Sequence, residues 1–123
     1  MFSSILIIAI GGALGAVSRH CSSIFFESYV PGKPFISTLV VNVTGSILIG
    51  GFYLLADYYD IKDTVKLFFV VGFLGSLTTF STFSFDFVNM INQRTYFLAA
   101  SYLLLNLCIS CIFIFIFLKY IRA

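Results

Sequence analysis

The side chains best suited to chemistry in this sequence are hydroxyls, amides and aromatic rings within uncharged stretches. From Gly72 to Ser84, serine and threonine occupy consecutive or near-consecutive positions, and Gly72 and Gly75 stand at the start of the run. Hydroxyls at this density can bond to helix carbonyls and compete with the helix ladder, while glycine lowers the cost of a break. The run therefore predicts a broken helix, whose freed carbonyls can coordinate a cation and whose new ends offer N–H groups.

Phe80 and Phe83 lie within this run, three positions apart, and so share one face of a helix. An aromatic ring has a positive edge, which can weakly solvate an anion. The pair could therefore line an anion path. Taken alone, two phenylalanines among sixteen are more simply explained by packing against lipid or the core.

Uncharged polar residues also recur every fourth position elsewhere in the chain. They form two stripes: Thr38, Asn42 and Ser46 in one stretch, and Tyr102, Asn106 and Ser110 in another. Hydroxyls and amides along a helix face can bind a small anion through O–H and N–H donors, without a fixed charge that would trap it. Such residues also form hydrogen bonds between helices in membrane bundles, and the stripes alone favour this second explanation.

The elements that must position these residues are membrane-spanning helices. Of the 123 residues, 60 % are hydrophobic and 10 % charged, whereas a soluble domain usually carries about 25 % charged residues. The charges leave four uncharged stretches, each near the roughly 20 residues that one helical crossing needs. These stretches run from Met1 to Ser18, Pro34 to Ala56, Leu67 to Phe85 and Thr95 to Leu118. We predict an all-α membrane protein with a single transmembrane domain, residues 1–123, and helices at about 3–26, 37–56, 65–90 and 96–120, the third of them broken near its centre.

This organisation excludes several classes of function. Four crossings leave too few residues for a soluble domain, a nucleotide fold or a catalytic site outside the membrane. A net charge of +2 without a cluster of Lys or Arg argues against nucleic-acid binding. The first stretch has no basic segment before it and no small-residue cleavage site before Arg19, so we interpret it as a helix of the mature protein and not as a signal peptide.

Ionisable groups are costly in hydrocarbon, so any that lie at depth are candidate functional groups. Arg19 could attract anions into a vestibule or bond free carbonyls, or it could snorkel to the membrane interface, where His20 is also expected. Asp86 lies toward the end of the third helix, so a proton- or cation-coupled carrier lacks its obvious carboxylate.

The chain has three cysteines, Cys21, Cys108 and Cys111, and the last two fall within an apolar run. An odd number does not fit a framework of paired disulfides. Because cysteine in apolar surroundings behaves as a small hydrophobe, we expect buried packing and not a redox or metal role.

Basic residues near the helix ends give a weak orientation signal. The side that holds both termini has four of them: Lys62, Lys66, Lys119 and Arg122. The other side has Lys33 and Arg94, with Arg19 if it lies near that end. So small a bias allows insertion in both directions, and two opposed copies could pair as an antiparallel homodimer. Pairing would also help to build a pore, because four helices packed around one axis fill their centre with side chains.

Taken together, the motifs resemble the Fluc (CrcB) family of fluoride channels. The likeness covers essentially the whole chain and rests on three motifs: Gly11-Gly12-x-x-Gly15-Ala16-x-x-Arg19, Ser37-Thr38-Leu39-x-Val41-Asn42-x-x-Gly45, and Gly72-x-x-Gly75-x-x-Thr78-Thr79-Phe80-Ser81-Thr82-Phe83. The third motif is the most specific. The resemblance implies a fluoride-selective channel of the bacterial inner membrane, not an enzyme, which lowers cytoplasmic fluoride by passive efflux.

The resemblance also implies a partner, a cation and a set of site residues. The partner is a second copy, in an antiparallel dual-topology homodimer with two pores, and no organic cofactor is implied. The fluoride pore would be formed by Asn42, Phe80, Phe83, Ser81, Thr82, Tyr102, Asn106 and Ser110. Arg19 would lie in the vestibule, and the backbone carbonyls of Gly75 and Thr78 would hold a structural Na⁺ at the dimer interface. His20 and Ile114 depart from the family pattern, and Ile114 leaves the extent of the last polar stripe open.

Fluoride chemistry fits these residues, because a small, strongly hydrated acceptor needs hydrogen-bond donors at close quarters. Two other functions stay open on the sequence. A small dual-topology exporter has a similar length, but it depends on an embedded acid in its first helix, and none lies between Met1 and Arg19. A non-transporting assembly subunit would use the polar stripes to join helices.

Overall fold

The computed structural model describes residues 2–121, and nearly all of them are helical. Four segments are long and apolar enough to cross a membrane: Phe2–Tyr29, Phe35–Tyr59, Asp63–Asn92 and Tyr96–Ile121. They match the four predicted crossings and extend slightly beyond most of the predicted ends. The described residues contain no strand. Arg122, which entered the orientation count, lies outside them.

A short turn with both prolines joins α1 (Phe2–Tyr29) to α2 (Phe35–Tyr59). Gly32 in this turn has φ +74°, a left-handed angle that glycine adopts without the steric cost of a side chain. Its N–H donates to Glu27 Oε1 at 3.0 Å, which ties the turn to the end of α1. The turn therefore returns the chain directly into the second crossing.

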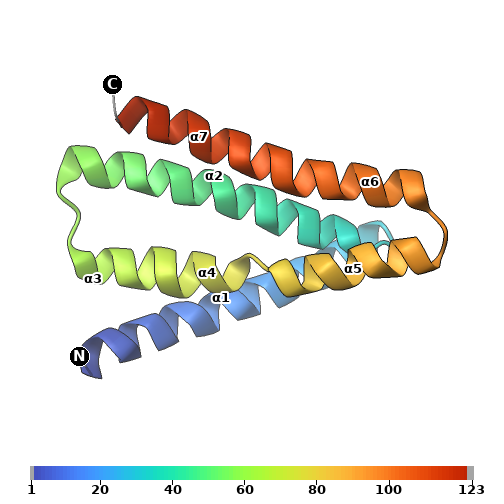
Figure 1. Ribbon diagram of the computed structural model, residues 1–123. Coiled ribbons are helices and arrows are strands. Elements are labelled where there is room, and N and C mark those ends of the chain that lie inside the picture. The colour runs from blue at the N-terminus through green and yellow to red at the C-terminus, as the bar shows by residue number, and fades with distance from the viewer. Residues whose placement is uncertain (1, 122–123) are drawn as a thin grey trace.

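The third crossing is not one continuous α-helix. It comprises α3 (Asp63–Lys66), the π-helical η1 (Leu67–Leu74), α4 (Gly75–Leu77) and α5 (Phe80–Asn92). Between α4 and α5, Thr78 with ψ 154° and Thr79 with φ −151° have extended backbones, and the crossing bends slightly there (Figure 1). The interruption predicted from the hydroxyl-rich run thus falls at these two threonines.

The fourth crossing also contains a π-helical segment. It consists of α6 (Tyr96–Leu104), η2 (Leu105–Ile109) and α7 (Ser110–Ile121). π-helical turns are rare and often occur at functional sites. Here η2 carries Asn106, the middle residue of the second polar stripe.

Glycines allow the crossings to approach closely. In Figure 1, α1 runs beside the third crossing and α2 beside the fourth, and both chain ends lie at the same end of the bundle. A Cβ added at Gly11 would overlap the carbonyl oxygen of Phe68 in η1, and one added at Gly50 would overlap the ring of Phe117 in α7. These small residues therefore serve helix contacts within the chain.

The buried interior is divided by the interruption in the third crossing. On the α4 side, Val41 packs with Leu74 and Leu77. On the α5 side, a second cluster contains Phe83, Met90, Ala99 and Tyr102. The interior also contains buried polar residues, among them Thr38, Thr79 and Asn106. The interior therefore combines apolar packing with a polar centre.

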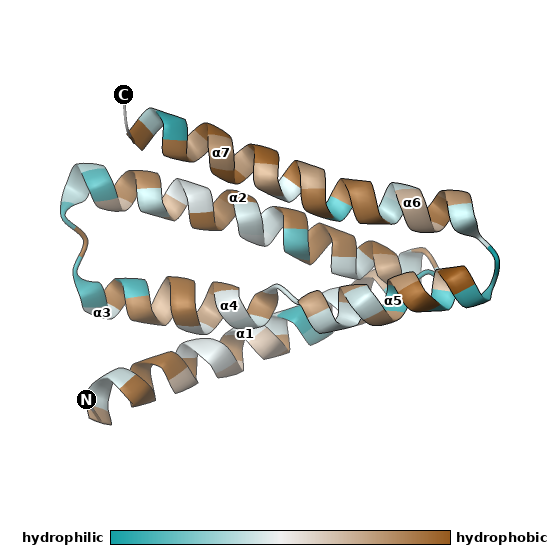
Figure 2. Cartoon of the chain, viewed as in Figure 1, coloured by the Kyte–Doolittle hydropathy of each residue, from teal (hydrophilic) through white to brown (hydrophobic). Residues whose placement is uncertain are grey.

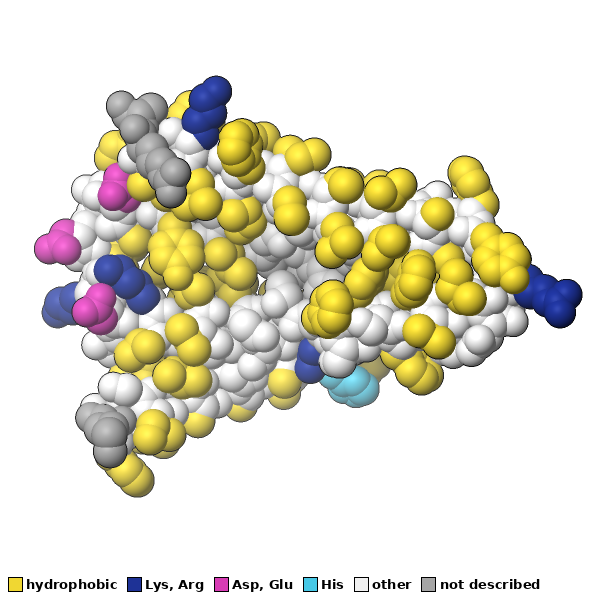
Figure 3. Space-filling view, viewed as in Figure 1, with side chains coloured by type: hydrophobic (Ala, Val, Ile, Leu, Met, Phe, Trp, Pro, Cys, Tyr) yellow, Lys and Arg dark blue, Asp and Glu magenta, His cyan; other side chains and the backbone are white. Residues whose placement is uncertain are grey.

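The outer surface of the bundle exposes many large apolar side chains along its length. Figure 2 shows hydrophilic residues mainly at the connections, and Figure 3 shows Lys, Arg, Asp and Glu gathered mostly at the two ends. Large side chains such as Phe97 and Phe115 are 88 % and 70 % exposed. Such a surface would be a liability in water and is suited to a bilayer.

The expectation that the cysteines are buried was wrong. Cys21, Cys108 and Cys111 are all free and exposed. They lie on the outer surface of the bundle, where the bilayer gives a small hydrophobe the same apolar surroundings as a core. Spacing within an apolar run could not distinguish these two environments.

Candidate functional site

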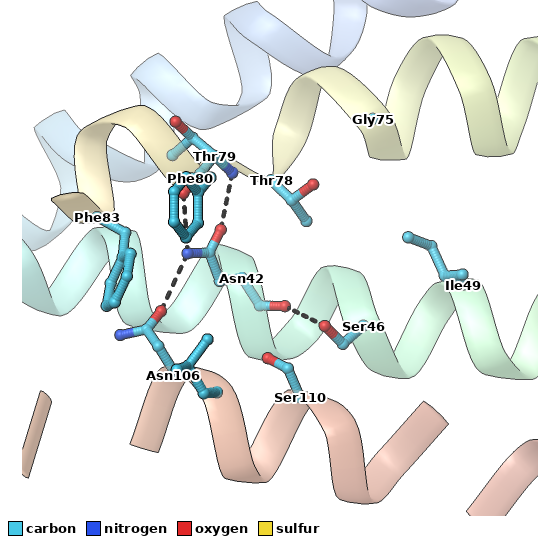
Figure 4. A pocket seen from close by; sticks show the side chains of 11 residues that line it. Asn42, Ser46, Ile49, Gly75, Thr78, Thr79, Phe80, Phe83, Asn106 and Ser110 are labelled. Carbon is cyan, nitrogen blue, oxygen red and sulfur yellow. Dashed lines mark hydrogen bonds between the residues drawn. The ribbon is translucent and has the colours of Figure 1, made fainter. Parts of the chain in front are cut away.

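An open cavity of about 350 Å³ lies beside the interruption of the third crossing (Figure 4). It is lined by most of the predicted site residues: Asn42, Gly75, Thr78, Phe80, Phe83, Asn106 and Ser110. They come from α2, the third crossing and the fourth crossing. The described residues that line the cavity include no charged side chain. The last two residues of each predicted polar stripe, Asn42 and Ser46 in one and Asn106 and Ser110 in the other, therefore line one uncharged space.

Asn42 joins this space to the interrupted backbone. Its Oδ1 accepts the N–H of Thr79 at 2.8 Å, and its Nδ2 donates to the carbonyl oxygen of Thr79 at 3.1 Å. Nδ2 also donates to Oδ1 of Asn106 at 3.0 Å (Figure 4). Asn106 in turn donates from Nδ2 to the carbonyl oxygen of Tyr102 at 3.1 Å. One chain of hydrogen bonds therefore connects α2, the interruption and η2.

The aromatic pair is placed by the start of α5. The ring centroids of Phe80 and Phe83 are 5.5 Å apart, and Figure 4 shows both rings on the same side of the cavity. Phe83 is only 4 % exposed and lies 5.3 Å from the ring of Tyr102. Phe80 is 73 % exposed in the single chain. One ring is thus fixed by packing, and the other is presented at the surface.

The hydroxyl groups around the cavity differ in their partners. Ser46 Oγ donates to the carbonyl oxygen of Asn42 at 2.8 Å, and Thr78 Oγ1 donates to that of Leu74 at 2.9 Å. Both bonds run back to the preceding turn of the same crossing, as expected for hydroxyls inside helices. The hydroxyl of Ser110 instead points toward the space between Asn106 and Ser46 (Figure 4).

Ser81 and Thr82, predicted as pore hydroxyls, lie in the first turn of α5. Thr79 caps this helix, since its Oγ1 accepts the N–H of Thr82 at 3.3 Å. The same Oγ1 donates to Thr82 Oγ1 and shares a hydrogen bond with Ser81 Oγ, each at 3.2 Å. The three hydroxyls therefore form a cluster at the new helix end.

A second cavity of about 260 Å³ lies between α1, α2 and α5. It is lined by Arg19 and His20 together with hydroxyl residues that include Ser37, Thr79 and Thr82. Arg19 is partly exposed, and His20 is exposed. Thr79 lines both cavities, so the two cavities adjoin at this residue.

Sequence reasoning missed a buried carboxylate beside the site. Asp86 is 8 % exposed, and its Oδ2 accepts hydrogen bonds from Thr38 Oγ1 at 2.9 Å and from the Tyr102 hydroxyl at 3.1 Å. These two donors begin the two polar stripes. The only signal in the sequence was a carboxylate one helical turn after Thr82, together with two polar stripes that each begin with a hydroxyl residue. Tyr102 thus faces Asp86 and does not line the first cavity.

Comparison with known proteins gives consistent matches along the chain. Residues 6–118 match the family described as "CrcB-like protein, Camphor Resistance (CrcB)". A protein of Shewanella sediminis named "Fluoride-specific ion channel FluC" is 42 % identical over 112 residues, which cover 90 % of this chain and 89 % of the relative. A protein of the same name from Shewanella amazonensis is 42 % identical over 115 residues, covering 91 % and 92 %. One from a Hydrogenobaculum species is 38 % identical over 99 residues, covering 80 % of each chain.

Proposed function

This chain belongs to the CrcB family, and we propose that it is a fluoride-selective channel through which fluoride leaves the cytoplasm passively. The observation that carries the proposal is the cavity at Thr78 and Thr79, where uncharged polar stripes meet two aromatic rings. The family relatives are named as ion channels, so the chain is not an enzyme, and it is a multi-pass bacterial membrane protein. This favours a channel over the exporter and the assembly subunit that the sequence left open.

The chemistry of the cavity suits a small anion that accepts strong hydrogen bonds. The Ser110 hydroxyl and the Asn106 amide supply donors, and the edges of Phe80 and Phe83 add weak positive potential. The described lining residues carry no fixed positive charge that would trap the ion. Arg19, in the adjacent second cavity, would attract anions to the entrance, and the hydroxyls of Ser81 and Thr82 would lie on the way from there to the rings.

A second copy of the chain would complete the site. In a single chain the cavity is open and Phe80 is 73 % exposed, which would place polar groups against lipid. A partner laid over this face would enclose the cavity and bury the ring. The basic residues give only a weak bias between the two ends, with Lys62, Lys66, Lys119 and Arg122 against Lys33 and Arg94, so opposite orientations are both permitted. An antiparallel homodimer would enclose the cavity and is compatible with both orientations.

The carbonyls of Gly75 and Thr78 fit a structural Na⁺ between two such copies. In a continuous helix, each carbonyl would accept the N–H four residues later. Here the N–H of Thr79 bonds to Asn42 and the N–H of Thr82 bonds to Thr79 Oγ1, so neither carbonyl receives that partner. Uncharged carbonyl oxygens are suitable ligands for an alkali cation in a membrane protein. The ion would neutralise these carbonyl dipoles where the two copies cross.

Efflux from liposomes tests the proposed function. Purified protein is reconstituted with internal potassium fluoride or potassium chloride, and valinomycin carries the compensating charge without an imposed proton gradient. We expect fluoride release that far exceeds the release from empty liposomes, with chloride release at the background rate. Fluoride release at background would contradict the channel, and release that requires a proton gradient would indicate a carrier.

A further inference from the structure

We propose that Asn42 is a positioning residue that holds the interruption of the third crossing in place, and that it is not itself a ligand of the transported ion. The proposal rests on the proposed fluoride function and assigns the residue a different part in it. It depends on three hydrogen bonds of one side-chain amide. It also depends on the backbone conformation of the residue to which that amide binds.

The amide of Asn42 takes the place of a missing backbone partner. Thr79 is extended, with φ −151° and ψ 123°, so its N–H and C=O point to the same side, as in a strand. The Asn42 amide binds both groups at once, with its oxygen on the N–H at 2.8 Å and its nitrogen on the C=O at 3.1 Å. Both backbone groups would otherwise be unsatisfied inside the membrane, where each costs several kcal/mol, about as much as a lost hydrogen bond in hydrocarbon.

The orientation of this amide is fixed by its neighbours. Nδ2 faces two oxygens, the carbonyl of Thr79 and Oδ1 of Asn106, while Oδ1 faces an N–H. A flipped amide would place oxygen against both oxygens. Asn106 cannot easily reverse either, because its own Nδ2 donates to the carbonyl of Tyr102 at 3.1 Å.

The donors of Asn42 are therefore already used. A side-chain amide has two N–H donors, and the two acceptors at 3.0 and 3.1 Å account for both. An ion bound by Asn42 would have to displace Thr79 or Asn106. Because α5 begins at Phe80, directly after Thr79, losing this link would move the start of α5 and the aromatic pair with it.

Two NMR measurements on the full-length protein in lipid test the proposal, with Thr79 and the asparagine side chains labelled. In the wild type we expect the N–H of Thr79 to be protected from hydrogen exchange, and in Asn42→Ala we expect at least a tenfold loss of that protection. Asn92→Ala, which changes an exposed asparagine at the end of α5, is the matched control and should leave the protection unchanged. Unchanged protection in Asn42→Ala would overturn the positioning role.

The second measurement is a titration of the wild type with sodium fluoride, compared with sodium chloride. We expect the side-chain NH₂ signals of Asn42 to stay in place while the backbone signal of Ser110 shifts as the ion enters the cavity. A saturable fluoride-dependent shift of the Asn42 NH₂ signals would make it a ligand and overturn the proposal, and this arm needs no variant to fold. If no cavity signal responds, the proposed fluoride function fails, while the exchange of Thr79 still decides the positioning role.

Discussion

Serine and threonine side chains in the third crossing serve different neighbours, although they stand close together in the chain. Thr78 bonds back to the turn before it, Thr79 caps the helix after it, and Ser84 Oγ donates to the carbonyl of Phe80 at 2.9 Å. Each of these three hydroxyls therefore already has a hydrogen-bond partner within the third crossing. Backbone groups at the interruption are therefore hydrogen-bonded by side chains of the third crossing as well as by Asn42.

Phe80→Ile tests the aromatic pair. The Phe80 side chain is 73 % exposed in the single chain, so its loss should cost the monomer fold little. Its ring edge is lost in the variant, so we expect fluoride efflux to fall at least tenfold while the protein still purifies as wild type does. Phe85→Ile is the control, because Phe85 is also on α5 and is 67 % exposed. Wild-type efflux from Phe80→Ile, or an equal loss from Phe85→Ile, would remove the special role of this ring.

Thr38→Val tests the buried carboxylate. Valine has the shape of threonine, but it removes the hydroxyl that donates to Asp86 at 2.9 Å. We expect the free energy of unfolding to fall by about 1–3 kcal/mol, the usual cost when a buried acceptor loses a donor. Unfolding in detergent, monitored by circular dichroism, measures the change, and Thr38→Ser keeps the hydroxyl as a control. A valine variant as stable as the serine variant would show that the bond contributes nothing.

Side-chain roles were predictable only where spacing within one helix reports them. The stripes at Asn42 and Asn106 follow from four-residue spacing, and the structure brings them within hydrogen-bond distance. The network at Asp86 could not be predicted, because its two donors lie 48 and 16 residues away in sequence. Only the packing of three crossings makes them neighbours.

At the scale of elements, hydropathy and turn residues were sufficient for the four crossings. The interruption was also predictable, because dense hydroxyls and glycine weaken a helix locally. The π-helical segments η1 (Leu67–Leu74) and η2 (Leu105–Ile109) were not predicted. They have ordinary apolar sequences, and η1 lies against the glycines of α1, so its geometry depends on close packing between crossings that no local pattern reports.

Gly15→Ala tests the contact between α1 and the third crossing. A Cβ there would lie 2.9 Å from the carbonyl carbon of Phe73, so backbone must move. We expect a destabilisation of about 1–3 kcal/mol, typical of overpacking, measured by thermal unfolding in detergent. Gly51→Ala is the matched control, since its nearest atoms, in Phe117, are 3.9 Å away. That variant should be neutral or slightly more stable, and equal losses in both would refute the contact as the cause.

At the scale of the whole molecule, one face of the single chain is open and partly polar. An open polar cavity and an exposed aromatic ring lie on a bundle that exposes many large apolar side chains between its charged ends (Figure 3). The antiparallel pair that we propose would cover this face with a copy of itself. The sequence could indicate such pairing only through its weak charge bias, because no pattern of residues in it identifies the open face.

The topology of the chain in membranes tests that pairing. A protease-cleavable tag is placed after residue 123, and protease is added to one side of sealed vesicles. Because the charge bias is weak, we expect about half of the tags to be cleaved, and all of them after detergent is added. Complete cleavage or complete protection in sealed vesicles would show a single orientation and exclude the antiparallel dimer.

The reversal potential of the current tests the central claim most directly. Purified protein is placed in a planar bilayer with a tenfold fluoride gradient, equal chloride on both sides and no pH difference. A passive fluoride-selective channel predicts a reversal potential of about 59 mV, the value for a tenfold ratio of a monovalent ion, with the sign set by fluoride. A reversal potential near zero, where chloride is at equilibrium, would contradict fluoride selectivity.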